Sequence, residues 1–219
     1  MNSNTLWAAL LVLTCVFSSC KESNNDIDVS NIEVSLQIIR FDNEITALKT
    51  NGIDKTLPTI LENYGSFFEL YSNQIIKVGS SYSADFQNNM TLFLQYELFN
   101  DINNEITRIF GDTGFAYSEE LQKAFKHYKH YFPKAEIPVI YTFNGGFNQS
   151  IVIDSSLLAI GLDKYLGIEN SLYKRLTIER FRLKNMYPEK LISDCMTAMA
   201  ESEFPFAMQQ DNLLSHMIY

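Results

Sequence analysis

Histidines are the first residues to consider for chemistry, because imidazole binds metals and transfers protons near neutral pH. His127 and His130 would share one face of a predicted helix with Lys123 and Lys126. The two lysines would repel a divalent cation, and no cysteine or third histidine lies nearby in the sequence. His216 is followed by methionine, where a zinc peptidase helix needs glutamate as general base. We therefore predict no metal site and a solvated basic face, with an anionic lipid surface or an acidic partner as the alternative contact.

Two aspartates and one cysteine are the other candidates for catalysis. Asp154 and Asp163 stand in a central segment with glycines nearby, but nothing in the sequence brings two carboxylates to acid–base distance. We interpret both as turn or helix-cap residues. Cys195 has no flanking basic residue to lower the pKa of its thiol, so we expect a small buried hydrophobe. P-loop, nucleophile-elbow and dinucleotide-binding motifs are lacking, and we predict no catalytic residue and no cofactor.

The cysteine at position 20 follows the pattern of a bacterial lipoprotein signal. The first 19 residues contain no charged side chain, and Leu6–Phe17 is an apolar run shorter than the roughly 20 residues that span a bilayer. Two small residues, Ser18 and Ser19, come directly before Cys20. We expect cleavage after Ser19 and acylation of the Cys20 thiol, which palmitate would label. The first five residues lack Lys or Arg, and an ordinary secretory signal with a chance cysteine is the alternative.

The remaining composition indicates one acidic domain on a short tether. After a signal peptide over residues 1–19, we interpret residues 20–30 as the lipidated cysteine with a polar tether. Its Lys-Glu start is similar to the signal that sends some lipoproteins of the Bacteroidota to the cell surface. The inner membrane and the outer membrane are the alternative locations of the anchor. Residues 31–219 can form a single globular domain, since 46% of the chain is hydrophobic. The net charge of −9 disfavours nucleic acid as a partner.

The segment over residues 132–167 predicts a small sheet. Alternating apolar residues over 137–143 suit a strand, and Asn144-Gly145-Gly146 suits a turn. The stretch SIVID over 150–154 and the apolar run over 157–160 predict two further strands. Because the connections are too short to hold a parallel crossover, we expect these strands to pair antiparallel.

Helices are expected before and after this segment. Ser118–His130 is the clearest helix, with Leu121, Phe125 and Tyr128 on its buried face. We therefore predict an α+β fold, a predominantly helical domain around a small antiparallel sheet. A last apolar helical pattern runs to Tyr219 without a stop signal, so we expect the natural protein to continue beyond it.

Three stretches of the chain carry a resemblance to a known family: Ile39–Asp42 (IRFD), Tyr141–Gln149 (YTFNGGFNQ) and Ile160–Gly167 (IGLDKYLG). With the signal that ends at Cys20, they resemble the GldB gliding motility lipoproteins of the Bacteroidota, over essentially the whole chain after Cys20. The resemblance implies a lipid-anchored, noncatalytic component needed for gliding and linked to the type IX secretion apparatus. It also implies a distant likeness to zincin-type peptidases without their metal motif, and a chain that is truncated at its C-terminal end.

Five residues are our candidates for contacts with partners. Asp163, Lys164 and Tyr165 belong to the most specific stretch of the resemblance, and Lys123 and Lys126 to the basic helix face. We predict a structural or assembly role in the envelope, with a membrane and other proteins of the gliding and secretion machinery as partners. Two alternatives stay open. One is a degenerate or incomplete zincin-like hydrolase, and the other is a surface lipoprotein that binds glycan or nutrient in an aromatic cleft.

Overall fold

The computed structural model describes residues 27–154 and 156–203. The described residues 27–31 belong to a unit of their own, in which Asp28 accepts a hydrogen bond from the backbone N–H of Ser30. The unit that carries the fold begins at Ile32. Cys20 and the predicted last helix with His216 lie outside the described residues. Among the residues described, we find no helix with the length and apolar content of a membrane span.

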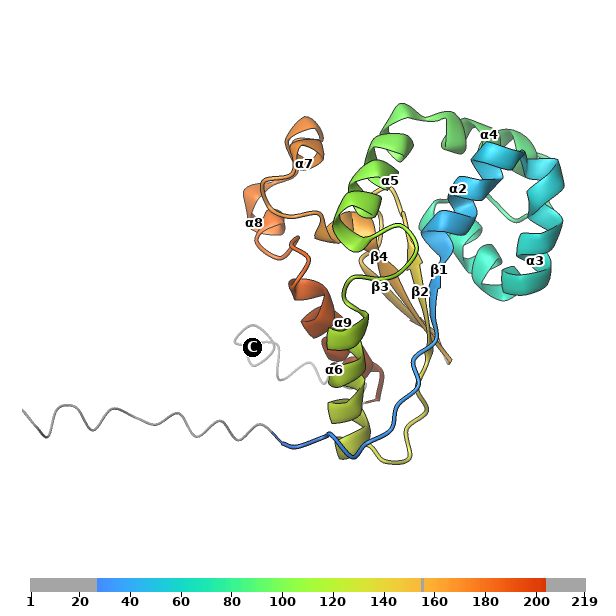
Figure 1. Cartoon of the computed structure of the whole chain (residues 1–219). Helices are drawn as coiled ribbons and strands as arrows, with labels where there is room; N and C mark the ends of the chain where they lie inside the picture. Colours follow the sequence, from blue (N-terminus) through green and yellow to red (C-terminus); the bar gives the residue numbers. More distant parts are fainter. Residues whose placement is uncertain (1–26, 155, 204–219) are drawn as a thin grey trace, which may run out of the picture. The chain divides into compact units, whose positions relative to one another are not determined.

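A four-stranded mixed sheet runs through the unit that begins at Ile32 (Figure 1). The strands lie in the order β1-β2-β4-β3, with the bounds β1 (Ile38–Arg40), β2 (Val139–Phe143), β3 (Ile151–Asp154) and β4 (Leu157–Gly161). β2 pairs in parallel with both β1 and β4, while β3 and β4 are antiparallel. The predicted α+β class is confirmed, whereas the predicted antiparallel pairing is wrong for the contact of β2 with its neighbours.

The short connections do not exclude parallel strands, because β3 itself brings the chain back. After Phe143 the chain passes through a loop and returns along β3, so that β4 then runs parallel to β2. In the inner position β4 buries Leu158, Ala159 and Ile160 fully, whereas β3 at the edge is half-buried and ends at the exposed Asp154. Placing the more apolar strand between two partners removes more apolar surface from water.

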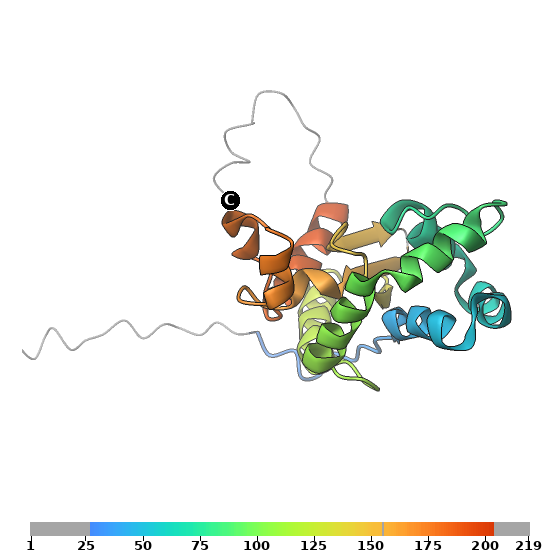
Figure 2. The same ribbon diagram turned by 90° about the horizontal axis from the view of Figure 1, so that it is seen from above.

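Helices cover both faces of the sheet, so that successive strand residues enter two different cores. Ile140, Leu158 and Ile160 belong to one core, and Phe143 and Ala159 belong to the other. Figure 1 shows α2, α3 and α4 on one side of the strands and α6 and α9 on the other. The same arrangement is seen from above in Figure 2. Alternation such as that over residues 137–143 is typical of a strand with one buried face, but here both faces of the strand are covered.

The core that contains Phe143 is rich in aromatic rings. In it, the Phe41 ring meets the rings of Phe67, Phe68 and Tyr71. Each such edge-to-face pair contributes about 0.5–1.5 kcal/mol of stability beyond what the burial of its apolar area contributes. The elements that build this core are α2 (Phe41–Asn51), α3 (Ile53–Leu70), the π-helix η1 (Tyr71–Ile75) and α4 (Phe86–Gln95).

The other core lies against α5 (Glu97–Phe110), α6 (Ser118–Tyr131) and α9 (Lys190–Glu203). The helix predicted over Ser118–His130 is confirmed as α6, with Leu121, Phe125 and Tyr128 buried. After β4, the chain enters the 3-10 helix η2 (Leu162–Tyr165) without a loop. Two short helices, α7 (Ser171–Arg175) and α8 (Arg180–Leu183), then lead to α9.

Candidate functional site

The loop after β2 packs closely on the end of β4 because glycines stand at the contact. At Gly161 a Cβ atom would lie 2.2 Å from the backbone oxygen of Gln149, so a larger residue requires the backbone to move. At Gly145 a Cβ atom would lie 2.8 Å from the Phe143 ring. The two glycines therefore let the loop over residues 144–150 approach η2, which follows Gly161 directly.

Asp163 holds this loop in place through its carboxylate. The side chain is fully buried and accepts hydrogen bonds from the backbone N–H groups of Gly145, at 3.2 Å, and Phe147. Phe147 has a φ of 65°, in the left-handed region that non-glycine residues rarely adopt. Burial raises the pKa of Asp163 to about 6, and the two backbone hydrogen bonds oppose that rise. These contacts agree with the turn role predicted for Asp163.

Tyr173 of α7 closes the network around Asp163. Its hydroxyl donates to the carbonyl oxygen of Asp163 and accepts the backbone N–H of Leu166, both at 2.8 Å. Its ring meets the Phe147 ring edge-on, with the ring centroids 5.7 Å apart. Burial raises the pKa of the Tyr173 hydroxyl, which keeps it neutral and able to donate. Asp163, Phe147 and Tyr173 thus form one connected group, which we name the Asp163 network.

Next to the Asp163 network lies an open cleft of about 470 Å³, which we name the Lys164 cleft. Lys164 and Arg182 place two cations on it, and Phe147 and Ile178 give it apolar surface. Burial lowers the pKa of Lys164, the charge of Asp163 opposes this change, and the charge of Arg182 adds to it. The arrangement can bind acidic groups through the cations and apolar groups through the rings and aliphatic chains.

Tyr165 and Asp194 also line the Lys164 cleft and are hydrogen-bonded to each other. The Tyr165 hydroxyl donates to Oδ2 of Asp194 at 3.0 Å, and Lys190 pairs with Oδ1 of Asp194 at 2.8 Å. Burial and the charge of Asp194 raise the pKa of Tyr165. Cys195 is fully buried, and burial raises the pKa of its thiol. The prediction that Cys195 is a small buried hydrophobe is confirmed by this position.

Comparison with protein families gives one finding that bears on identity. The family described as gliding motility protein GldB matches residues 22–219. The chain belongs to this GldB family. The name of the family marks its members as lipoproteins, and the match supports a gliding motility protein. A comparison with curated proteins and one with solved structures each found no match.

The first GldB-like stretch, Ile39–Asp42, connects several parts of the fold. The Arg40 guanidinium donates to both carboxylate oxygens of Asp42, at 3.0 and 2.7 Å. The same group donates to the backbone oxygen of Gly111 at 2.8 Å, and Asp42 accepts the hydroxyl of Thr142. The side chains of Arg40 and Asp42 are only 9% and 3% exposed. This nearly buried ion pair therefore joins β1 and α2 to β2 and to the end of α5.

The GldB-like stretch around η2 supplies three of the five predicted contact residues. Lys164 and Tyr165 line the Lys164 cleft, whereas Asp163 is enclosed by the loop that it holds. Lys123 and Lys126 lie on α6, outside this cleft, with Lys123 exposed and Lys126 half-buried. The interaction role of all five residues stays a prediction.

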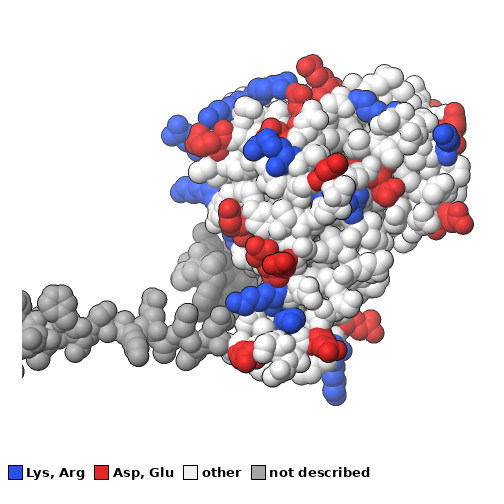
Figure 3. Space-filling model, viewed as in Figure 1, with Lys and Arg blue, Asp and Glu red and all other residues white. Residues whose placement is uncertain are grey.

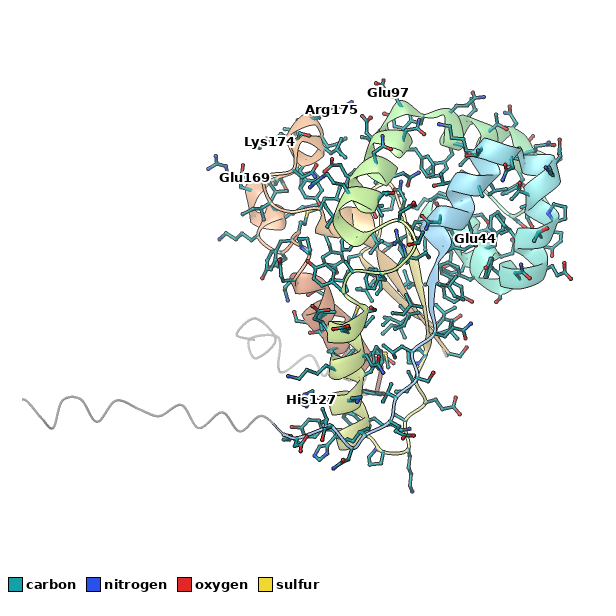
Figure 4. The ribbon with its side chains drawn as sticks, in the orientation of Figure 1. Glu44, Glu97, His127, Glu169, Lys174 and Arg175 are labelled. Carbon is teal, nitrogen blue, oxygen red and sulfur yellow. The ribbon has the colours of Figure 1, made fainter. Side chains whose placement is uncertain are left out.

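The histidine pair lies on α6, as the helical spacing predicts. Figure 4 labels His127 on this helix, well away from Glu169, Lys174 and Arg175 around α7. His130 is exposed. Across residues 27–154 and 156–203, no group of three His, Cys, Asp or Glu side chains is placed to hold a metal ion.

Sequence reasoning missed Phe147, Tyr173 and Arg182 as members of the Asp163 network and the Lys164 cleft. The turn that contains Phe147 was recognised, but a positive φ at phenylalanine has no signal in residue type. Tyr173 and Arg182 stand in a stretch of mixed apolar and basic residues, where two short helices leave no periodic pattern. The signal that could have pointed to this site is the presence of glycines in the stretches Tyr141–Gln149 and Ile160–Gly167, because glycine allows two backbones to approach closely.

Proposed function

We propose that this chain is a lipid-anchored protein of the cell envelope that acts as a structural or assembly component of the gliding and type IX secretion machinery. The observation that carries the proposal is the GldB family match over residues 22–219. The lipoprotein signal pattern that ends at Cys20 supports the anchored part of it.

The proposed anchor is the thiol of Cys20, after removal of residues 1–19. Acyl chains at this thiol would confine the domain to a membrane surface, since each buried methylene contributes about 0.8 kcal/mol. The polar stretch over residues 20–30 would serve as the tether. The inner membrane, the outer membrane and the cell surface are all compatible with such an anchor.

In this proposal the domain binds other proteins of the machinery and catalyses no reaction. The Lys164 cleft is a suitable contact site because the Asp163 network holds its wall, and a preorganised surface loses little entropy on binding. An acidic side chain of a partner would fit between Lys164 and Arg182. The chain has 26 acidic and 17 basic residues. Nucleic acid is not among the proposed partners, because a chain with this negative net charge repels its phosphates.

The motility and anchor parts of the proposal are tested with a deletion strain. We expect the strain to stop spreading on agar and to recover with the wild-type chain, while Cys20→Ser gives no palmitate labelling and is released from membranes in a high-salt wash. A deletion strain that spreads normally would contradict the motility role. Palmitate labelling that persists in the Cys20→Ser variant would contradict the anchor.

The contact role of the Lys164 cleft is tested in the same strain. Lys164→Gln removes one cation from the cleft, and Lys55→Gln removes one from an exposed position on α3 as the matched control. With both variants present at the wild-type level, we expect slower spreading and fewer co-purified machinery proteins for Lys164→Gln alone. Equal behaviour of the two variants would show that the cleft is not the contact site.

A further inference from the structure

The segment over residues 168–187 is basic in an otherwise acidic chain. It carries two acidic and five basic side chains, whereas the whole chain has 26 acidic and 17 basic residues. In Figure 3, blue side chains gather in the upper left, where Figure 1 places α7 and α8. The basic residues of this segment, which we name the α7–α8 surface, are Lys174, Arg175, Arg180, Arg182 and Lys184.

Apolar side chains are exposed on the same segment. Phe181 is 65% exposed and Ile168 46%, and Leu176 and Tyr187 are exposed as well. Single exposed apolar residues are normal on a protein surface. Their combination with five cations in twenty residues is typical of surfaces that lie on a membrane, where rings and aliphatic chains enter the headgroup layer and cations meet lipid phosphates.

A cleft of about 700 Å³ opens on the α7–α8 surface. Lys174, Arg180 and Lys184 line it together with the apolar side chains of Ile168 and Leu183, and one carboxylate, that of Glu169, lines it as well. Three cations around one cleft form a site for phosphate oxygens, which accept their hydrogen bonds and balance their charge.

The connection between α7 and α8 shapes this cleft through Thr177. This lining residue has a φ of 53°, which is strained for a β-branched side chain. Its N–H donates to the carbonyl oxygen of Lys174 at 3.2 Å, which turns the chain back after α7. The strained turn thus brings Arg180 and Lys184 to the same cleft as Lys174.

Three of the five cations of the α7–α8 surface form ion pairs: Lys174 with Glu169, Arg175 with Asp101 at 2.6 Å and Arg182 with Glu179 at 3.4 Å. Lys174 pairs with Glu169 at 2.8 Å, but both side chains are largely exposed, at 62% and 82%. Exposed pairs of this kind are weak and exchange readily with other ions. Arg180 and Lys184 form no salt bridge with any residue that the structure describes.

We propose that the α7–α8 surface docks on an anionic membrane, with lipid phosphates in the cleft between Lys174, Arg180 and Lys184 and with Phe181 in the headgroup layer. This contact goes beyond the proposed function, because an acyl anchor on a tether leaves the orientation of the domain free. Docking through a second site would fix which face of the domain meets the membrane and which faces meet other proteins.

The test measures co-sedimentation of the full chain with lipid vesicles. The chain carries Cys20→Ser so that no acyl group contributes, and the apolar run over residues 6–17 is common to every variant. We expect stronger binding to phosphatidylcholine vesicles with about 30% phosphatidylglycerol than to pure phosphatidylcholine, and weaker binding as salt rises. Each cation near an anionic surface raises the affinity for it about fivefold. Changing Lys174, Arg180 and Lys184 to Gln should therefore lower the preference for anionic over neutral vesicles on the order of 100-fold.

A second triple variant controls for net charge. Lys55, Lys77 and Lys134 are exposed residues outside the α7–α8 surface, and changing them to Gln removes the same three charges. We expect this control to keep most of the vesicle preference, and thermal unfolding checks that both variants are folded. Phe181→Ala should weaken binding to anionic vesicles several-fold.

Three outcomes would overturn the proposal. The first is equal binding of the two triple variants to anionic vesicles. The second is equal binding of the wild-type chain to anionic and neutral vesicles, which would leave an acidic protein as the better occupant. The third is saturation of the cleft by millimolar glycerol phosphate with loss of vesicle binding at constant ionic strength, which would assign the cleft to a soluble phosphate.

Discussion

The carboxylate of Asp163 accepts the backbone N–H of Phe147 and holds that residue at a φ of 65°. A strained backbone conformation costs of order 1–3 kcal/mol and persists when its surroundings determine it. Here the surroundings are the fully buried carboxylate of Asp163 and the Tyr173 ring. The relationship explains how a short loop after β2 becomes a fixed wall of the Lys164 cleft.

The pH dependence of stability should reveal the buried carboxyl of Asp163. Its pKa is about 6 in the folded protein, above the ordinary 3.8, so the folded state holds the proton more tightly. The stability that this group contributes is therefore full below about pH 4 and is lost as pH rises through about 6, on the order of 3 kcal/mol. Urea unfolding at about pH 4 and about pH 7 should show that the wild-type chain loses on the order of 3 kcal/mol of stability relative to Asp163→Asn over this interval. A gap that does not change between about pH 4 and 7 would contradict the assignment.

Gly161→Ala should destabilise the fold by about 3 kcal/mol or more, because the new Cβ atom meets a backbone oxygen at 2.2 Å. Gly65→Ala is the matched control, since a Cβ atom there has no neighbour within 4 Å and Gly65, which has no positive φ, follows the kink of α3 at Tyr64. We expect that control to be neutral or stabilising by up to about 1 kcal/mol. The midpoints of urea unfolding measure both changes, and similar midpoints for the two variants would refute the close approach.

Tyr173→Phe should cost about 1–3 kcal/mol of stability, although it removes a single oxygen atom. The hydroxyl serves the carbonyl oxygen of Asp163 and the N–H of Leu166, and both backbone groups would lose a partner in a buried place. Tyr82, which is 84% exposed, provides the control substitution Tyr82→Phe with little expected effect. Thermal unfolding distinguishes the two, and an unchanged melting temperature for Tyr173→Phe would speak against the Asp163 network.

Asp42→Ala should cost about 3–5 kcal/mol, because it leaves the nearly buried guanidinium of Arg40 without its carboxylate. The exposed pair of Lys174 with Glu169 offers the comparison, and Glu169→Ala should leave the unfolding midpoint unchanged. Urea unfolding measures both variants. If the two substitutions had equal effects, the ion pair in the Ile39–Asp42 stretch would not be what joins β1 to β2 and the end of α5.

Local patterns in the sequence were sufficient for the fold class and for single elements. The spacing of Leu121, Phe125 and Tyr128 predicts α6 because a helix places residues three and four apart on one face. Alternation over residues 137–143 predicts β2 for the same kind of reason. The family resemblance, too, depends on short stretches that can be read directly. All of these properties belong to neighbours along the chain.

Contacts between distant residues were decided by the tertiary structure. Whether β4 lies beside β2 in parallel depends on which strand loses more water-exposed apolar area, a comparison between Leu158–Ile160 and β3 that no single segment contains. Likewise, Asp163 lies sixteen residues from Phe147 and ten from Tyr173, and nothing in those residue types announces that they meet. Residue types determine local geometry over a few positions, but burial is a property of the whole folded chain, so it selects the partners of buried polar groups only once the cores have formed.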